Sequence, residues 1–293
     1  MFGVLAYSIW GLFPLYWPLL KPSSAEEILA HRIAWSLVAC LVLLVAVRGG
    51  ARIRALAHEP RRAAALAAAA VLIGINWYVY IWAVNHGHVV ESALGYFVNP
   101  LVAVLLGVVV LGERLRRVQW VAVGVSVLAV LVLTLDYGRP PWIALVLALS
   151  FGTYGLLKKI AAMPAVDGLT VETLVLIVPA VVYLGWLSST GGSTFTHAGP
   201  GHAVLLATSG AVTAVPLLCF AGAANRLPLS TVGLLQYLTP VLQFLLGIVV
   251  FHETMPPARW AGFGLVWAAL AVFTVEAVRY QRTSMRAAVE SIA

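Results

Sequence analysis

The sequence predicts an all-α integral membrane protein of ten transmembrane helices, built as two inverted repeats of five helices each. The composition, a series of apolar segments and an internal repeat lead to this prediction. Of the 293 residues, 62% are hydrophobic and 10% are charged, whereas soluble domains carry about 25% charged residues. A soluble fold of this size cannot cover its surface with so few charges, but a lipid-embedded protein can.

The apolar residues fall into ten segments, each close to the roughly 20 residues that a helix needs to cross a bilayer. His31 and Arg32 interrupt the second segment near its start, and Glu172 lies near the start of the seventh. We expect the ten spans at residues 2–20, 28–47, 64–84, 90–111, 117–135, 141–157, 170–188, 202–224, 229–250 and 257–276.

The positions of the basic residues predict the orientation of the spans. If the N-terminus is cytoplasmic, 14 of the 18 Lys and Arg residues lie in cytoplasmic loops or in a basic C-terminal tail, residues 277–293. Lys21, Arg139 and Arg259 are then on the outer side, and Arg32 is within a helix. Cytoplasmic loops carry an excess of Lys and Arg, so we expect both termini to be cytoplasmic. The net charge of +7 follows from this topology and does not indicate nucleic-acid binding.

The chain also contains an internal repeat. A shift of 140 positions places Pro100 on Pro240, Glu113 on Glu253 and Trp120 on Trp260 without a gap. The repeats are expected at residues 1–136 and 140–276. Because each contains an odd number of spans, the second enters the membrane from the opposite side and is therefore inverted. Inverted repeats recur in secondary transporters, whose binding sites lie near the bilayer midplane between the halves.

Several strings of residues resemble a known family. They are AYSIWGLFPLYW (6–17), EEILAHRIAWS (26–36), NWYVYIWAVNHGHVVESALGYFVNPL (76–101), LGERL (111–115), SFGTYGLLKK (150–159) and LPLSTVGLLQYLTPVLQFLLG (227–247). The chain resembles the drug/metabolite transporter superfamily, EamA type, and within it the RarD group. This resemblance implies a multi-pass protein of the inner (cytoplasmic) membrane that exports or exchanges small metabolites or drugs.

Polar side chains at membrane depth are the candidates for a substrate cavity, because they are costly there unless they have partners or face water. Tyr96 and Gln236 occupy equivalent repeat positions, so we expect them to face each other across the cavity. For Asn99 and Gln236 the alternative to cavity lining is that they only bridge helices. Trp10 and Trp77 lie deeper than the tryptophans near the span ends and are candidates to stack on a flat substrate, with a purely structural role as the alternative. The candidate cavity residues are Trp10, Asn76, Trp77, Tyr80, Tyr96, Asn99, Tyr154, Gln236 and Gln243.

Four prolines within the apolar segments are candidate hinges or helix breaks: Pro14, Pro100, Pro216 and Pro240. A proline inside a helix removes one backbone donor and frees a carbonyl. Asn99–Pro100 and Thr239–Pro240 lie at matched places in the two repeats, and paired breaks indicate a transporter site or hinge. The alternative is a static kink that improves packing.

A small group of charged residues is the candidate for proton coupling or gating. Glu27 and His31 are one helical turn apart and share a face, and Arg32 follows them. The alternative is a structural salt bridge at the lipid–water boundary. Glu172 occupies the place of Glu27 in the second repeat, with Lys158 or Lys159 as its expected partner. With Arg32 near the end of its span, we expect no Lys or Arg at the bilayer midplane. The absence of a cation there disfavours a strongly anionic substrate.

Other functions find less support in the sequence. Glu113 and Glu253 follow spans and are interpreted as anchors of helix ends. No nucleotide-binding or hydrolase motif occurs, and the HxH at His86 and His88 lacks a third metal ligand in sequence. We therefore expect a secondary transporter without cofactors or metals, not an enzyme, whose partners are lipid and a small-molecule substrate. The alternative is a receptor, scaffold or accessory subunit. The sequence leaves the oligomeric state open.

Overall fold

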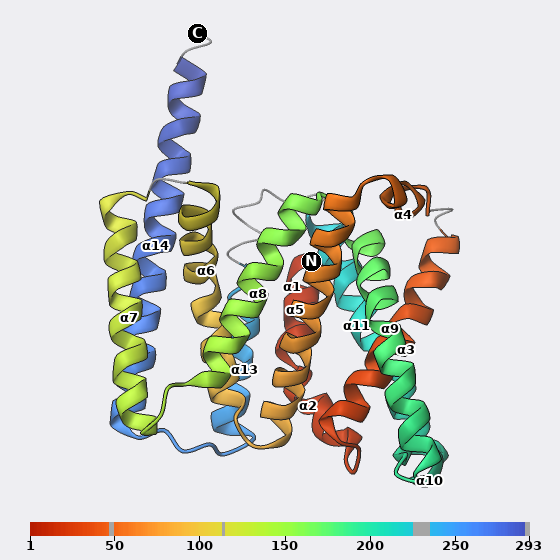
Figure 1. The fold of residues 1–293 in the computed structure, drawn as a ribbon. Helices are drawn as coiled ribbons and strands as arrows, with labels where there is room; N and C mark the ends of the chain where they lie inside the picture. Colours follow the sequence, from red (N-terminus) through yellow and green to blue (C-terminus); the bar gives the residue numbers. More distant parts are fainter. Residues whose placement is uncertain (47–49, 113–114, 225–234, 291–293) are drawn as a thin grey trace.

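The computed structural model describes residues 1–46, 50–112, 115–224 and 235–290, and these residues form helices joined by short loops (Figure 1). The helices of the first half are α1 (Phe2–Gly11), α2 (Phe13–Tyr16), η1 (Trp17–Leu20), α3 (Ala25–Ala46), α4 (Ala51–Ala55), η2 (Leu56–His58), α5 (Pro60–Asn85), α6 (Val89–Leu111) and α7 (Arg117–Tyr137). Those of the second half are α8 (Trp142–Ala161), α9 (Ala165–Ser189), α10 (Thr194–His197), α11 (Pro200–Ala224), α13 (Leu238–Val249) and α14 (Pro257–Glu290).

Within these described ranges, eight helices are long and apolar enough to cross a membrane. A ninth span results if the bent pair Phe2–Gly11 and Phe13–Leu20, which meet at 44°, counts as one. The expected span 229–250 corresponds to the shorter apolar helix α13, and residues 229–234 lie outside the described residues. The prediction of a helical membrane protein is confirmed, while the number of ten spans is not reached by these helices alone.

The two halves cross the molecule in opposite directions. In Figure 1, α1 descends from the N-terminus, α3 returns upward, and α5, α6 and α7 continue the alternation. The second half begins with α8, which ascends where α1 descends, and ends with the ascending α14. Over the described residues, the helices of the second half thus run opposite to the corresponding helices of the first.

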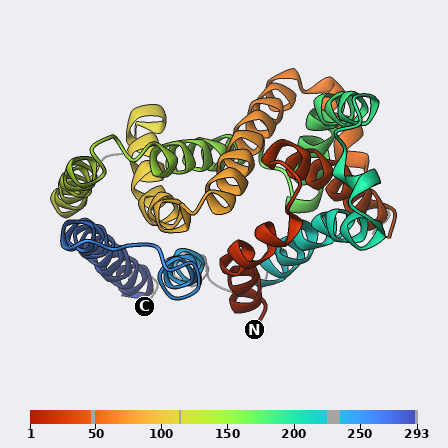
Figure 2. The same ribbon diagram turned by 90° about the horizontal axis from the view of Figure 1, so that it is seen from below.

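Helices of one half pack mainly against helices of the other. α5 and α6 contact α8, α3 contacts α9 and α11, α1 contacts α11 and α13, and α7 contacts α14. Figure 2 shows α7 and α14 side by side at one end of the molecule. Large apolar side chains such as Val109 (79% exposed) and Leu135 (83% exposed) remain on the outer surface, where lipid is their solvent.

Glycines permit the closest crossings between the halves. A Cβ at Gly95 of α6 would lie 2.8 Å from the carbonyl oxygen of Ala144 of α8. A Cβ at Gly210 of α11 would overlap the carbonyl oxygen of Trp35 of α3. Small residues at such crossings are typical of membrane helices, whose association depends on close packing.

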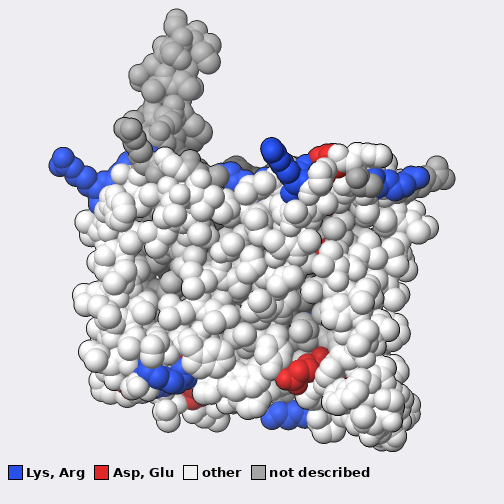
Figure 3. All heavy atoms as spheres, viewed as in Figure 1, with Lys and Arg blue, Asp and Glu red and all other residues white. Residues whose placement is uncertain are grey.

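The basic residues gather at one end of the bundle, here called the basic face (Figure 3). It contains α4, the start of α5, the start of α7 and the end of α8, which carry Arg52, Arg54, Arg61, Arg62, Arg117, Lys158 and Lys159. We call the opposite end, which carries α10, the α10 face (Figure 1). The C-terminal tail expected from residue 277 continues α14 as a helix as far as Glu290, so the tail is not a separate element.

Candidate functional site

Polar side chains from α5, α6 and α8 form one side of a buried central cluster. The Nδ2 of Asn76 donates to the carbonyl oxygen of Leu147 (3.1 Å) and to Oγ of Ser150 (3.0 Å). The hydroxyl of Tyr96 donates to Oδ1 of Asn76 (3.1 Å). Asn76 is 1% exposed, so these bonds satisfy an amide that would otherwise be costly at membrane depth. Three helices from both halves are thereby joined.

The other side of the central cluster comes from α1 and α13. Nε2 of Gln243 donates to the carbonyl oxygen of Trp10 (3.3 Å), and Oγ1 of Thr239 donates to the carbonyl oxygen of Tyr7 (2.9 Å). Both acceptors lie just before the bend at Leu12. The ring of Trp10 packs against Phe220 of α11, with 5.9 Å between ring centroids. The bent first span is thus held against the second half.

Arg32, a candidate for proton coupling or gating, is buried beside this cluster, and none of the ion pairs among the described residues includes it. Its guanidinium is 4.0 Å from the ring centroid of Trp77 and 5.0 Å from that of Trp17, and Nε donates to Oγ1 of Thr213 (3.0 Å). Tyr16, Tyr80 and Tyr96 are near enough to act on its charge. The buried interior therefore contains a cation, which weakens the argument against an anionic substrate.

Two predicted cavity residues have other surroundings. Tyr154 donates to Oε2 of Glu172 (3.2 Å) and belongs to the charged group near the basic face. Gln236 lies in the turn before α13 and is half-buried. No hydrogen bond joins Tyr96 to Gln236, both of which are described, and their expected position on opposite sides of a cavity stays a prediction. Gln243, seven residues further along, is the side chain that reaches the centre.

The remaining polar candidates, Asn99 and Tyr80, are buried without a hydrogen-bond partner among the side chains and backbone that the structure describes. Oδ1 of Asn99 faces the backbone of Gly152. The ring of Tyr80 packs edge-on against Tyr96, with 5.6 Å between centroids. Its hydroxyl is directed toward Gln243 without reaching hydrogen-bond geometry. The cluster therefore retains unused polar atoms.

The four candidate hinges occupy three kinds of position. Pro14 is in the first turn of α2, at the 44° bend of the first span. Pro100 and Pro216 are inside the continuous helices α6 and α11. Pro240 is the third residue of α13, in a first turn where the lost backbone donor has no helical partner in any case. The expected matched breaks at Pro100 and Pro240 are thus a helix interior and a helix start.

Glu27 fastens α3 to the loop at the α10 face. Its carboxylate accepts the backbone N–H (2.8 Å) and the hydroxyl (2.8 Å) of Thr194, which begins α10. Ser193 also donates to it (3.4 Å). The ring of His31 stacks on Phe195 instead of bonding to Glu27, with 4.7 Å between centroids. We call the contact of Glu27 with Ser193 and Thr194 the α10 latch. In the sequence, only the Ser- and Thr-rich composition of the loop at α10 pointed to this contact with Glu27.

Glu172 is part of an ion pair near the basic face. Nζ of Lys158 lies 2.7 Å from Oε1 of Glu172, and Glu172 is completely buried. The structure thus selects Lys158 from the two expected partners. Near this pair, Arg52 of α4 forms an ion pair with Asp167 of α9 (3.2 Å). These contacts join α8, α9 and the loop helix α4 at the basic face.

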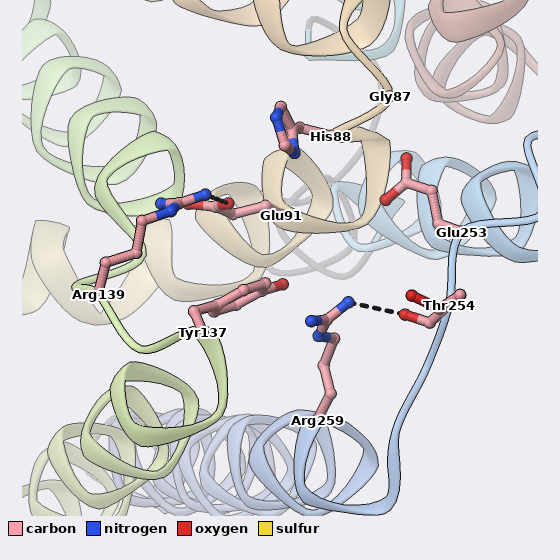
Figure 4. A pocket seen from close by; sticks show the side chains of 8 residues that line it. All are labelled: Gly87, His88, Glu91, Tyr137, Arg139, Glu253, Thr254 and Arg259. Carbon is pink, nitrogen blue, oxygen red and sulfur yellow. Dashed lines mark hydrogen bonds and ion pairs between the residues drawn. The ribbon is translucent and has the colours of Figure 1, made fainter.

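The α10 face also has a pocket of about 280 Å³, here called the charged pocket (Figure 4). Arg139 pairs with Glu91 (2.9 Å), and Arg259 lies over the ring of Tyr137, with its guanidinium 4.2 Å from the centroid. In Figure 4 both arginines extend toward the pocket, Arg139 from the left and Arg259 from below. The pocket is lined by Gly87, His88, Glu91, Tyr137, Arg139, Glu253, Thr254 and Arg259.

Glu253 in this pocket closes the N-terminus of α6. Its carboxylate accepts the backbone N–H groups of Val89 and Val90, the latter at 3.0 Å, which are donors that a helix start leaves unpaired. The prediction that Glu253 anchors a helix end is confirmed, while its repeat partner Glu113 lies outside the described residues. Burial raises the pKa of Glu253 to about 7, against the opposing effect of the two N–H groups.

Comparison with known proteins identifies the family. The EamA-like transporter family matches the chain twice, at residues 1–135 and 140–275. The chain belongs to the EamA-like transporter family. A protein of Streptomyces exfoliatus named RarD is 58% identical over 293 residues, which are 100% of this chain and 93% of that protein. The uncharacterized transporter YojE of Bacillus subtilis is 43% identical, with 97% of this chain and 96% of that protein covered.

The resemblance to the drug/metabolite transporter superfamily and its RarD group is therefore confirmed by full-length relatives. A solved crystal structure has a similar fold, with a TM-score of 0.57, 17% sequence identity, and coverage of 94% of this chain and 96% of that one. This EamA-like protein is a multi-span membrane transporter of the drug/metabolite kind.

Proposed function

We propose that this protein is a secondary transporter that moves small metabolites or drugs across the cytoplasmic membrane by alternating access. The observation that carries the proposal is the central cluster, in which polar and aromatic side chains of both inverted halves meet. Asn76 and Tyr96 come from the first half, and Gln243 comes from the second. A site between inverted halves opens to each face in turn when the halves, 1–136 and 140–276, rock against each other.

The cluster is closed in this conformation, so substrate entry requires the helices to separate. Asn76 and Gln243 are each 1% exposed, and Tyr80 is 3% exposed. The α10 latch at Glu27 closes one end, and the Lys158–Glu172 pair closes the other. We propose that these two contacts are the gates, which part in alternate states. The bend before Pro14 and the prolines inside α6 and α11 are the proposed hinges.

We further propose that the basic face is cytoplasmic, which places both chain termini inside the cell. Cysteine labelling tests this orientation in a background where Cys40 and Cys219 are replaced by Ala. Thr254→Cys at the α10 face should react with an impermeant maleimide in intact cells. Arg117→Cys at the basic face should react only after permeabilisation. Labelling of both positions in intact cells contradicts the proposed topology.

Transport itself is tested with purified protein in proteoliposomes, by a metabolite exchange screen under a set pH gradient. For a substrate found there, Tyr96→Phe should slow exchange about 5- to 10-fold, which corresponds to roughly 1 kcal/mol for one lost hydrogen bond. Tyr183→Phe on α9, a tyrosine outside the central cluster, is the matched control and should retain the wild-type rate. Wild-type exchange by Tyr96→Phe removes Tyr96 from the site, and absence of exchange for every compound contradicts the transporter proposal.

A further inference from the structure

Among the residues that the structure describes, the charge of Arg32 has no acidic partner. None of the ion pairs among the described residues includes Arg32, although its side chain is 3% exposed. Glu27, five residues earlier, bonds to the α10 loop instead. By contrast, the buried acids Glu91 and Glu172 each have a cation within 2.9 Å. A buried cation without an anion is unfavourable, so this one is a candidate to meet an anion from elsewhere.

The surroundings of Arg32 compensate its charge only in part. Trp77 and Trp17 lie beneath the guanidinium, with Phe13 further away at 5.7 Å. Aromatic faces attract cations but accept no hydrogen bonds of ordinary strength. The single hydrogen bond that the structure gives this side chain goes from Nε to Thr213. The terminal nitrogens of the guanidinium, which form the fork that binds carboxylates, are not used in it.

Two further donors beside Arg32 lack an acceptor. Nε1 of Trp17 and the hydroxyl of Tyr80 are buried and have no hydrogen-bond partner in the described parts of the chain. Trp17 contacts the guanidinium, and Tyr80 is near enough to act on its charge. The indole N–H only donates hydrogen bonds, so an acceptor must be supplied. A cation and the idle indole N–H of Trp17 at one buried place are complementary to an anionic oxygen group, and the hydroxyl of Tyr80, now directed toward Gln243, can turn to join them.

We propose that the Arg32 cage, defined as Arg32, Trp17, Trp77 and Tyr80, binds the carboxylate of a small aromatic monoanion. This inference rests on the proposed transporter function and names the substrate class. One cation favours a single negative charge, because the occupied site is then neutral in a low-dielectric interior. The flat carboxylate matches the guanidinium fork, and the rings of Trp77 and Trp17 supply an apolar wall for an aromatic body.

The first test measures binding without transport. Purified protein is heated with benzoate, phenylacetate or indole-3-acetate, and in parallel with the primary amide of each acid. The amides keep the shape and lose the charge. At least one acid should raise the Tm with a saturating concentration dependence, while its amide should not. If no acid in the panel stabilises the protein, or if acid and amide act equally, the inference is overturned.

Variants then locate the binding. Arg32→Gln should abolish the Tm shift caused by the acid, and Arg32→Lys, which keeps the charge without the fork, should weaken binding about tenfold. Arg54→Gln on α4 removes an exposed cation from the basic face and should leave the shift unchanged. If Arg32→Gln does not fold, the Kd of Arg32→Lys and the comparison of acid with amide on the wild type still test whether the acid binds at Arg32. An unchanged Kd in Arg32→Lys contradicts the proposed cage.

Exchange in proteoliposomes separates this inference from the transporter proposal. If the wild type exchanges the stabilising acid and Arg32→Gln does not, the result supports both the Arg32 cage and the transporter proposal. Exchange of neutral or cationic compounds only, with an unchanged rate in Arg32→Gln, overturns the cage and leaves the transporter. Binding of the acid at Arg32 without exchange of any compound supports the cage and contradicts the transporter.

Discussion

Glu27 and Glu172 occupy corresponding places in the two halves of the molecule, yet they are stabilised in different ways. Both carboxylates are at most 1% exposed. Glu172 faces a cation, Lys158, and a tyrosine hydroxyl. Glu27 accepts hydrogen bonds from a backbone N–H and from hydroxyls of the α10 loop, with no cation among the described donors. The repeat thus preserves the acid, while each half supplies its own partners.

This difference shows that the two Glu contacts, one at each end of the molecule, are interactions of different kinds. An ion pair joins α8 and α9 near the basic face, whereas neutral hydrogen bonds join α3 and the α10 loop at the other face. Loss of an acid from a buried ion pair leaves an unpaired charge, but loss of an acid from neutral donors leaves only unpaired dipoles. Substitutions should therefore separate the two sites energetically.

The largest effect is expected from Glu172→Ala. It leaves the ammonium of Lys158, whose side chain is 19% exposed, without its partner. We expect the free energy of unfolding to fall by about 3 kcal/mol, measured by unfolding in mixed detergent micelles. The double variant Glu172→Ala/Lys158→Met removes both charges and should recover most of the loss. If it recovers nothing, the charge of Lys158 is not the cause.

Glu27→Ala should have a smaller effect, about 2 kcal/mol, because the donors that it leaves behind are neutral. Glu27→Gln keeps one acceptor oxygen for the N–H of Thr194 and should cost about half as much. Equilibrium unfolding under the conditions used for Glu172 gives the comparison. A cost for Glu27→Ala equal to that of Glu172→Ala contradicts the distinction between the two ends.

The pH dependence of stability should reveal a third kind of acid at Glu253, which bonds to backbone N–H groups. Its pKa is about 7 in the folded protein, against an ordinary value of 4.5. The folded state therefore binds more protons in this interval, and the free energy of unfolding falls as pH rises from 4.5 to 7. After allowance for its partial exposure, we expect a decrease of about 1–2 kcal/mol. Unfolding midpoints across this range measure it.

Glu253→Gln is the control for this pH effect. The amide does not titrate, so its contribution should be constant over the same interval and the difference between variant and wild type should follow the protonation of Glu253. A parallel pH dependence in both proteins assigns the effect to another group.

The smallest effect is expected from Thr194→Val at the α10 latch. The change removes the hydroxyl that donates to Glu27 but keeps the backbone N–H that bonds to the same carboxylate. We expect a loss of about 0.5–1 kcal/mol, the value of one neutral donor. Thr196→Val, two residues on, whose hydroxyl bonds within the loop to the carbonyl of Ser193, is the matched control. A loss as large as that of Glu27→Ala would mean that the hydroxyl alone holds the latch.

Much of the candidate site was predictable from polarity at membrane depth. Asn76, Tyr80, Tyr96 and Gln243 were recognised in this way, and the structure buries all but Tyr96 almost completely. Arg32 was assigned to a charged group with Glu27 and His31, and its aromatic surroundings were not predicted. The chain bends at Leu12, and Trp17 with Trp77 surrounds the guanidinium, which no local pattern could indicate.

The sequence by itself determined the lipid-embedded helices, the inverted order of the halves and the gathering of basic residues at one end. These properties depend on composition, segment length and an odd number of crossings, all of which are local or additive along the chain. Only the tertiary structure decided which polar groups meet. Arg32 bonds to a residue 181 positions away, and Glu27 to one 167 positions away. Such pairs form because helices of opposite halves pack closely, and helix crossings are not encoded in any short segment.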